Sequence, residues 1–284
     1  MSVLALAMVL AAASIHATWN LLAKRASGGA AFVWLFSTLA GAIYAPFVVA
    51  VLLVERPHID PGMLPFLVGS PMLNVIYFLL LQRSYRSGDL SLVYPLARGG
   101  APLITTIVAV MLFGERPTLL AVAGTLLITL GVVILSSAPY ARRGDRQAVT
   151  YGLLTGASIA AYTLWDKYAA SVALVPPLFL GWGIYVGQAV LLAPLALRSW
   201  ETVQSEWRRH RREALGVGVL SPLSYVLVLG ALVFTPVSYV ASAREISILI
   251  GVVMGSRLLA EERGSRRLIA AGAMVVGIIG LAVT

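Results

Sequence analysis

The chain contains a series of apolar stretches, each about 20 residues long, separated by short polar breaks. An α-helix rises about 1.5 Å per residue, so such a stretch crosses the roughly 30 Å hydrocarbon core of a bilayer. Strands of a membrane barrel alternate apolar with polar residues, which runs such as 121–135 do not. The pattern predicts an all-α integral membrane protein with ten transmembrane helices. Their expected ranges are 3–23, 31–54, 63–81, 90–113, 119–136, 151–170, 177–197, 214–233, 237–259 and 268–283.

The composition agrees with a lipid environment. Apolar residues make up 59% of the chain and charged residues 12%, whereas soluble domains average about 25% charged residues. So few polar side chains cannot cover a water-soluble core, but a bilayer accepts apolar side chains on the outside. The first stretch lacks a basic region before it and a small-residue cleavage pattern after it, which favours a membrane helix over a signal peptide.

Several functions are excluded or disfavoured. The net charge is +9, but the cations lie in short loops and not along a polar groove, so we expect no nucleic-acid partner. Without cysteine, thiol catalysis and Cys-ligated metals are impossible. The sequence has no Gly-Lys pair for an ATP-binding loop and no metalloprotease or serine-hydrolase motif. We therefore expect neither an enzyme nor a bound cofactor or metal.

Loop charges predict the orientation in the membrane. Nearly all the loop lysines and arginines would lie on one side, and the other side holds only Arg56 and Arg116. The positive-inside rule makes the basic side cytoplasmic, which for ten helices places both termini outside. The basic run 208–212 is expected to contact lipid headgroups. We expect the protein in a bacterial inner membrane.

The two halves of the chain share short motifs in the same order. Tyr94 precedes Tyr239 by 145 residues, and Arg98 precedes Arg244 by 146. Gly114-Glu115-Arg116 matches Glu261-Glu262-Arg263 with a separation of 147 residues between Glu115 and Glu262. Small gaps account for this drift. Ser14-Ile15 and Ser158-Ile159 extend the match to the first and sixth stretches.

This repeat divides the chain into residues 1–137, a polar linker at 138–148, and residues 149–284. Each outer part is expected to form a repeat of five helices. Because five is an odd number, the second repeat must enter the membrane upside down relative to the first, which gives two inverted repeats. Such repeats can exchange two shapes and open a central site to either side in turn, so alternating access is the expected mechanism.

The order and spacing of these motifs resemble the EamA-type transporters of the drug/metabolite transporter superfamily. The resemblance rests on the two halves, on Leu112-Phe113-Gly114-Glu115-Arg116, on Glu261-Glu262-Arg263, and on His16-Ala17-Thr18-Trp19-Asn20. It implies a secondary transporter, often an exporter of amino acids, other metabolites or drugs, with a cavity lined by both halves. Typical members place their termini in the cytoplasm, opposite to the loop charges here. Small multidrug relatives carry a glutamate in the first span, where this chain has His16.

Two arginines are the first candidates for a binding site, because charges at membrane depth usually face a cavity or a partner. Arg98 and Arg244 lie eight and seven residues into their stretches and approach the midplane from opposite faces. Two guanidinium groups would suit a carboxylate or phosphate. The alternative role is structural: Glu245 pairs with one arginine, or each arginine caps carbonyl groups of a broken helix.

Polar and aromatic residues recur at matching places in the two halves. The candidates for substrate binding, besides the two arginines and Glu245, are His16, Trp19, Asn20, Asn74, Tyr77, Tyr94, Trp165, Asp166 and Tyr239. Ser221, Ser224 and Tyr225 offer further hydrogen-bonding groups. Packing and interhelical contacts are the alternative role for all of these. Asp166, Glu245 and His16 are the possible proton carriers within the stretches.

These features predict a secondary transporter that moves a small metabolite, an amino acid or other organic anion or zwitterion, as an exporter. The alternative is a passive channel or scramblase-like pathway, although channels usually build their filter by oligomeric symmetry. An intramembrane enzyme is less favoured still. Glycine pairs such as Gly183 and Gly187 allow close helix packing within the chain or in a dimer, so both a monomer and a homodimer remain open.

Overall fold

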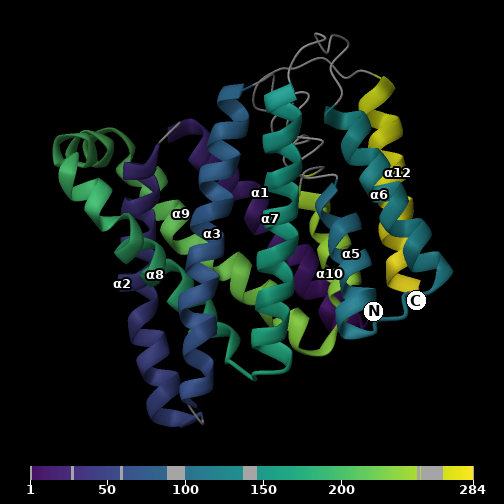
Figure 1. The fold of residues 1–284 in the computed structure, drawn as a ribbon, viewed down its shortest axis with the longest axis horizontal. Coiled ribbons are helices and arrows are strands. Elements are labelled where there is room, and N and C mark those ends of the chain that lie inside the picture. Colours follow the sequence, from purple (N-terminus) through teal and green to yellow (C-terminus); the bar gives the residue numbers. More distant parts are fainter. Residues whose placement is uncertain are drawn as a thin grey trace.

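The computed structural model describes residues 2–26, 29–57, 60–87, 100–136, 146–247, 250 and 265–283. In these ranges the protein consists of helices and connections without a strand, which confirms the predicted all-α class for this part (Figure 1). The helices are α1 (Val3–Ala26), α2 (Ala30–Val54), the short 3-10 helix η1 (Pro61–Met63), α3 (Leu64–Ser87), α5 (Gly100–Phe113), α6 (Leu119–Ser136), α7 (Arg146–Ser171), α8 (Pro177–Arg198), α9 (Trp200–Phe234), α10 (Val237–Arg244) and α12 (Ser265–Val283).

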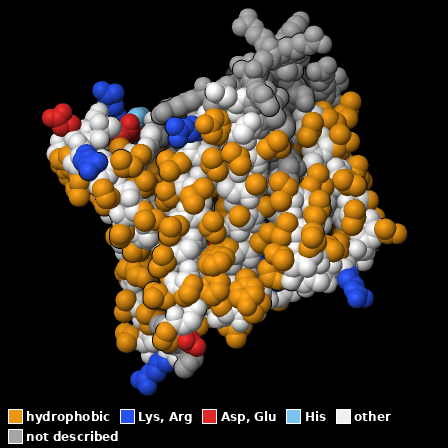
Figure 2. Space-filling view, in the orientation of Figure 1, with side chains coloured by type: hydrophobic (Ala, Val, Ile, Leu, Met, Phe, Trp, Pro, Cys, Tyr) orange, Lys and Arg blue, Asp and Glu red, His pale blue; other side chains and the backbone are white. Residues whose placement is uncertain are grey.

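The helices have the length and surface of membrane helices. Among the residues that the structure describes, four segments are long and apolar enough to cross a bilayer by themselves: Val3–Ala23, Ala30–Val54, Pro177–Arg198 and Trp200–Phe234. Shorter apolar helices are Ala101–Phe113, Leu119–Ile134 and Gly272–Val283. Figure 2 shows apolar side chains spread over the sides of the molecule, with charged side chains near its rims. Lipid is the solvent that accepts such a surface.

Helices of the first half pack on helices of the second half. α6 lies beside α12, α1 packs on α9, α3 on α7, and α2 on α8, while α2 also contacts α9 and α3 contacts α8 (Figure 1). Exchanging the halves turns α1–α9 into α7–α3 and α2–α9 into α8–α3, and leaves α2–α8 in place. The pairing of these helices is therefore symmetric under exchange of the two halves. The expected fourth and ninth helices include residues 90–99 and 251–259, which lie outside the described residues.

Glycines let these helices approach closely. A Cβ atom on Gly187 of α8 would lie 2.3 Å from Cγ of Pro71 in α3, and one on Gly183 would lie 3.0 Å from Leu67. A Cβ atom on Gly124 of α6 would lie 2.6 Å from the carbonyl oxygen of Gly277 in α12. The pair Gly183 and Gly187 therefore serves packing within the chain.

Several helix boundaries differ from the predicted ranges: α3 extends to Ser87 instead of 81, α7 begins at Arg146 instead of 151, and the largest differences are in α9 and α10. α9 begins at Trp200, before the expected start at 214, and bends at His210, whose backbone angles are not helical (φ −126°, ψ 26°). The residues before the bend are polar but still helical, so hydropathy could not detect them. α10 ends at Arg244, with Glu245 as its C-cap, inside the expected range 237–259. Two adjacent charged residues interrupt the apolar stretch at that point.

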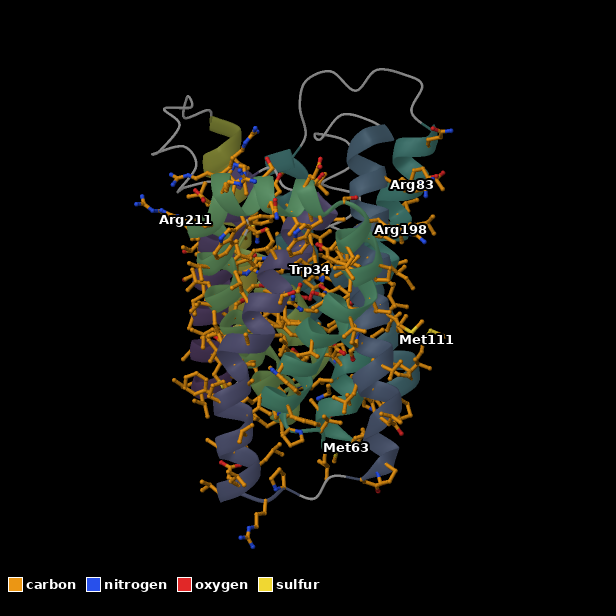
Figure 3. All side chains as sticks on the ribbon, turned by 90° about the vertical axis from the view of Figure 1, so that its left-hand side faces the viewer. Trp34, Met63, Arg83, Met111, Arg198 and Arg211 are labelled. Carbon is orange, nitrogen blue, oxygen red and sulfur yellow. The ribbon has the colours of Figure 1, made fainter. Side chains whose placement is uncertain are left out.

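The two ends of the molecule differ in charge. Figure 3 places Arg83, Arg198 and Arg211 toward one end and Met63 at the opposite end. The connection between α5 and α6 and the turn between α9 and α10 lie at the end of Met63, and both termini of the chain lie together there (Figure 1). We call this end the charge-poor face and the other the basic face.

Candidate functional site

A buried polar cluster joins α3, α7 and α9 at Asp166. Both Asp166 and Ser70 are inaccessible to solvent. Oδ1 of Asp166 accepts a hydrogen bond of 2.5 Å from the Ser70 hydroxyl, and Oδ2 accepts one from the Tyr225 hydroxyl. A buried carboxyl group is unfavourable without such donors. Ser70 and Tyr225 therefore make the buried position of Asp166 possible.

Arg244 of α10 lies against the face of the same tyrosine. Its Cζ atom is 5.9 Å from the centroid of the Tyr225 ring, a cation–π contact. Its charge also attracts the Asp166 carboxylate. Tyr225 thus contacts a carboxylate through its hydroxyl and a guanidinium through its ring. We call Ser70, Asp166, Tyr225 and Arg244 the Asp166 cluster.

The Asp166 cluster lies at a common depth. Ser70 is six residues after the start of α3, Asp166 is five before the end of α7, and Arg244 is seven after the start of α10. At 1.5 Å per residue, these positions are about 8 to 10 Å from the charge-poor face. The cluster therefore lies between that face and the middle of the membrane.

A small pocket adjoins the cluster beside α1. His16 of α1, Ser224 of α9, and Arg244 and Ser247 from the chain at α10 contribute its polar lining, and its free volume is about 10 Å³, roughly the room for one water molecule. The Ser224 hydroxyl donates a hydrogen bond of 3.1 Å to the carbonyl of Ala12. Both halves of the chain line this pocket, and it brings the predicted residues His16 and Arg244 together.

The other predicted residues of the first half lie around this centre. The rings of Trp19 and His16 meet edge to face at 4.7 Å, and the Asn20 amide donates to the His16 carbonyl at 2.9 Å. The Asn74 amide donates to the Ser70 carbonyl at 3.0 Å. The Asn20 and Asn74 amides therefore bond their own helices in this conformation.

Tyrosine rings form an aromatic wall beside the cluster. The ring of Tyr77 lies 5.6 Å from that of Tyr162, and both pack in one group of side chains with Tyr225. Tyr162 is buried, as an inward-facing residue of α7 should be. This wall gives the polar cluster an apolar neighbour.

Three other candidates are not part of the cluster. Trp165 points to the outer side of α7, is 36% exposed, and packs against Phe66 at 5.1 Å between ring centroids. Tyr239 is buried in the main apolar core, and Glu245 is buried at the end of α10. Tyr94 and Arg98 lie outside the described residues, so the two-arginine clamp stays a prediction.

Trp165 lines an apolar groove between α3, α5 and α7. Phe66, Val108, Phe113 and Tyr168 line it too, and its volume is about 540 Å³. Adjacent residues on a helix point about 100° apart. This explains how Trp165 faces the groove while Asp166 faces the interior.

Ser70 is the residue of the cluster that sequence reasoning missed. A serine in a membrane stretch is common, so its presence alone carries little information. Its spacing offers a signal, because Ser70, Asn74 and Tyr77 recur at helical intervals on one face of α3. A polar face on an otherwise apolar helix indicates an interior surface.

The model of the EamA-like transporter family matches residues 3–137 and again residues 146–283. The chain belongs to the EamA-like transporter family. The predicted resemblance is confirmed, and the EamA-like protein is an integral membrane protein of a transporter family, which supports the prediction that it is not an enzyme. Membership implies a small-molecule substrate and contact with membrane lipid.

A solved structure supports the fold of this EamA-like protein. A crystal structure described only as that of a "protein" superposes with a TM-score of 0.75 at 18% sequence identity, covering 98% of this chain and 96% of that chain. At this identity the likeness concerns the fold alone. A comparison with curated proteins gives no match.

Proposed function

We propose that this EamA-like protein exports a small zwitterionic or anionic metabolite by alternating access, and that the Asp166 cluster is the centre of its binding site. The observation that carries the proposal is the Asp166 carboxylate and the Arg244 guanidinium on two sides of one tyrosine. A buried carboxylate and a partly buried guanidinium are unfavourable in a membrane protein unless they have partners or a function.

A zwitterion complements this cluster. The carboxylate of a substrate would bind the Arg244 guanidinium, and its ammonium group would bind the Asp166 carboxylate. When substrate enters, Arg244 and Asp166 each keep an opposite charge beside them. The substrate charges therefore offset the free energy needed to separate Asp166 from Arg244. The rings of Tyr77 and Tyr162 would lie beside an apolar portion of the substrate.

The packing of the two halves supports alternating access. The pairs α1–α9 and α3–α7 are exchanged when the halves are exchanged. The family model matches the chain twice, at 3–137 and 146–283, which supports two repeats, here proposed at 1–137 and 149–284 with a linker at 138–148. Helices of both halves surround the Asp166 cluster. If the halves exchange shapes, the cluster opens to the opposite face. In this proposal the basic face is cytoplasmic, both termini lie outside, and the location is a bacterial inner membrane.

Uptake into proteoliposomes tests this function. Vesicles loaded with unlabelled amino acids or organic anions are given the same compound in labelled form, and exchange should be saturable. Asp166→Asn and Arg244→Gln should abolish it, while the matched change Arg208→Gln, in the exposed basic run, should not. Uptake that rises linearly with concentration overturns the carrier and favours a passive pathway. Saturable uptake that survives in both cluster variants overturns the assigned site.

A further inference from the structure

Glu115 of the first half caps a helix of the second half. It lies in the connection between α5 and α6. Its Oε1 atom accepts a hydrogen bond of 2.7 Å from the backbone N–H of Val237, and Oε2 accepts bonds of 3.2 and 2.6 Å from the N–H and hydroxyl of Ser238. Val237 and Ser238 are the first residues of α10, where backbone N–H groups have no partner within the helix. The negative charge also suits the positive end of the helix dipole.

The residues next to each end of this contact explain why Glu115 caps α10. The N-cap residue of α10 is Pro236, which has no side-chain group that can accept these hydrogen bonds. Gly114, directly before Glu115, has a φ of +62°, a conformation that favours glycine. A Cβ atom on Gly114 would meet nothing within 4 Å, so its requirement is conformational. Gly114 ends α5 and turns the chain so that Glu115 points to α10.

Lys167 of α7 stabilises the turn between α9 and α10 from the α9 side. Its ammonium group donates hydrogen bonds of 2.7 and 3.0 Å to the carbonyl groups of Leu232 and Thr235 at the end of α9. Its charge and that of Glu115 attract each other. The two residues differ in origin, because Lys167 belongs to the same half as α9 and α10, whereas Glu115 belongs to the other half.

We propose that Glu115 is a latch that keeps the charge-poor face closed. The inference rests on the proposed alternating access. α10 begins at the Glu115 contact and ends at Arg244, so the position of its first turn controls the position of the guanidinium. For substrate bound at Arg244 to reach the charge-poor face, α10 must separate from α5, and the Glu115 hydrogen bonds must break. The hydroxyls of Thr125 and Ser242, which share a bond of 2.8 Å, link α6 to α10 farther along the helix.

Thiol labelling tests the latch without a known substrate. The chain has no cysteine, so Ser247→Cys places a single thiol at the pocket beside Arg244. Its reaction with a membrane-impermeant maleimide is measured from each face in oriented vesicles. Adding Glu115→Ala should raise the labelling rate from the charge-poor face by about tenfold or more, because three charge-assisted hydrogen bonds are lost. Labelling from the basic face should not rise.

Two controls separate a latch from a static cap. Arg116→Gln changes the neighbouring exposed charge and should leave both rates unchanged. Lys167→Gln removes the hydrogen bonds to the Leu232 and Thr235 carbonyls and the attraction to Glu115, but leaves the Glu115 hydrogen bonds to α10 in place. It should therefore lower the melting temperature and change labelling much less than Glu115→Ala does. If Glu115→Ala lowers the melting temperature but leaves labelling from the charge-poor face unchanged, Glu115 is only a cap and the latch is wrong.

The same assay distinguishes this failure from failure of the proposed function. If the thiol of the Ser247→Cys protein reacts from both faces and Glu115→Ala changes neither rate, the latch fails and alternating access survives. If the thiol reacts from one face only in every variant, alternating access fails and the latch fails with it. A labelling rate that rises from both faces equally indicates general loosening and also contradicts the latch.

Discussion

The pocket at α1, α9 and α10 and the groove at α7, α3 and α5 occupy corresponding places in the two halves, yet their chemistry differs. The match of Ser14-Ile15 to Ser158-Ile159 makes Ala160 the counterpart of His16. Ala160 lines the groove and His16 lines the pocket. The pocket is small and polar, whereas the groove is large and apolar. The repeated backbone thus places two similar sites, and the side chains make only one of them suitable for a polar substrate.

This difference explains how a symmetric fold can hold an asymmetric site. In the described residues, the charged members of the Asp166 cluster both come from the second half. The first half contributes Ser70 to the cluster and His16 to the adjoining pocket. A substrate with two unlike ends needs two unlike contacts, which two identical halves cannot provide. The apolar groove opens toward lipid, where a polar lining would be unfavourable.

The largest expected effect on stability comes from Asp166. Its neighbour Trp165 is the matched comparison, because Asp166 faces the interior of the protein and Trp165 faces the apolar groove from the same helix, α7. Asp166→Ala removes the acceptor of two buried hydroxyls and the counter-charge of Arg244. We expect a loss of about 3–5 kcal/mol in the free energy of unfolding. Trp165→Ala, on the half-exposed side, should lose less, and the melting temperatures in detergent micelles compare the two. Equal losses would contradict the distinction between an interior and an outer face of α7.

The second effect concerns the hydroxyl of Tyr225. Tyr225→Phe keeps the ring against Arg244 but removes the hydroxyl that donates to Asp166. The free energy of unfolding should fall by about 1.5–3 kcal/mol, because hydrogen bonds to a charged group are strong. Tyr168→Phe makes the same change in the groove, where the ring is 45% exposed, and should change stability by less than about 0.5 kcal/mol. Thermal unfolding of both variants measures the difference. A larger loss in Tyr168→Phe would reverse the assignment of the polar region.

The sequence predicted the helices well where apolar stretches are bounded by polar residues. The ranges of α6 and α8 agree with those expected within a residue. The helical residues before the bend at His210 were missed, because a polar helix leaves no hydropathy signal. The end of α10 at Arg244 was missed because a search for apolar length passes over two charged residues.

For the site, the sequence identified unusual residues but not their contacts. Asp166, Arg244 and His16 were candidates because ionisable residues are rare at membrane depth. The contact of Asp166 with Ser70 depends on how α3 docks on α7, which no pattern within either helix contains. Glu115 was noticed only as a marker of the repeat, because its partner Val237 lies in a different half.

The smallest expected effect tests whether the groove takes part in transport. Ala13 of α1 lines the pocket and is 2% exposed, while Ala161 of α7 lines the groove and is exposed to lipid. Ala13→Leu adds three carbons where there is room for about one water molecule. Overpacking should lower the free energy of unfolding by about 1–3 kcal/mol and slow the exchange of substrate. Ala161→Leu fills part of a large groove and should leave the exchange rate within about twofold, since exposed substitutions rarely change stability by more than about 0.5 kcal/mol.

Initial rates of counterflow in proteoliposomes, corrected for the amount of folded protein, compare these two variants. Equal rates would mean that the pocket is not on the substrate route. If Ala161→Leu slows exchange more than Ala13→Leu does, the apolar groove carries the substrate, and a molecule with a large apolar portion would have to replace the zwitterion. Both changes add the same atoms on corresponding helices, one on α1 in the pocket and one on α7 in the groove, so the rates compare the roles of the two regions.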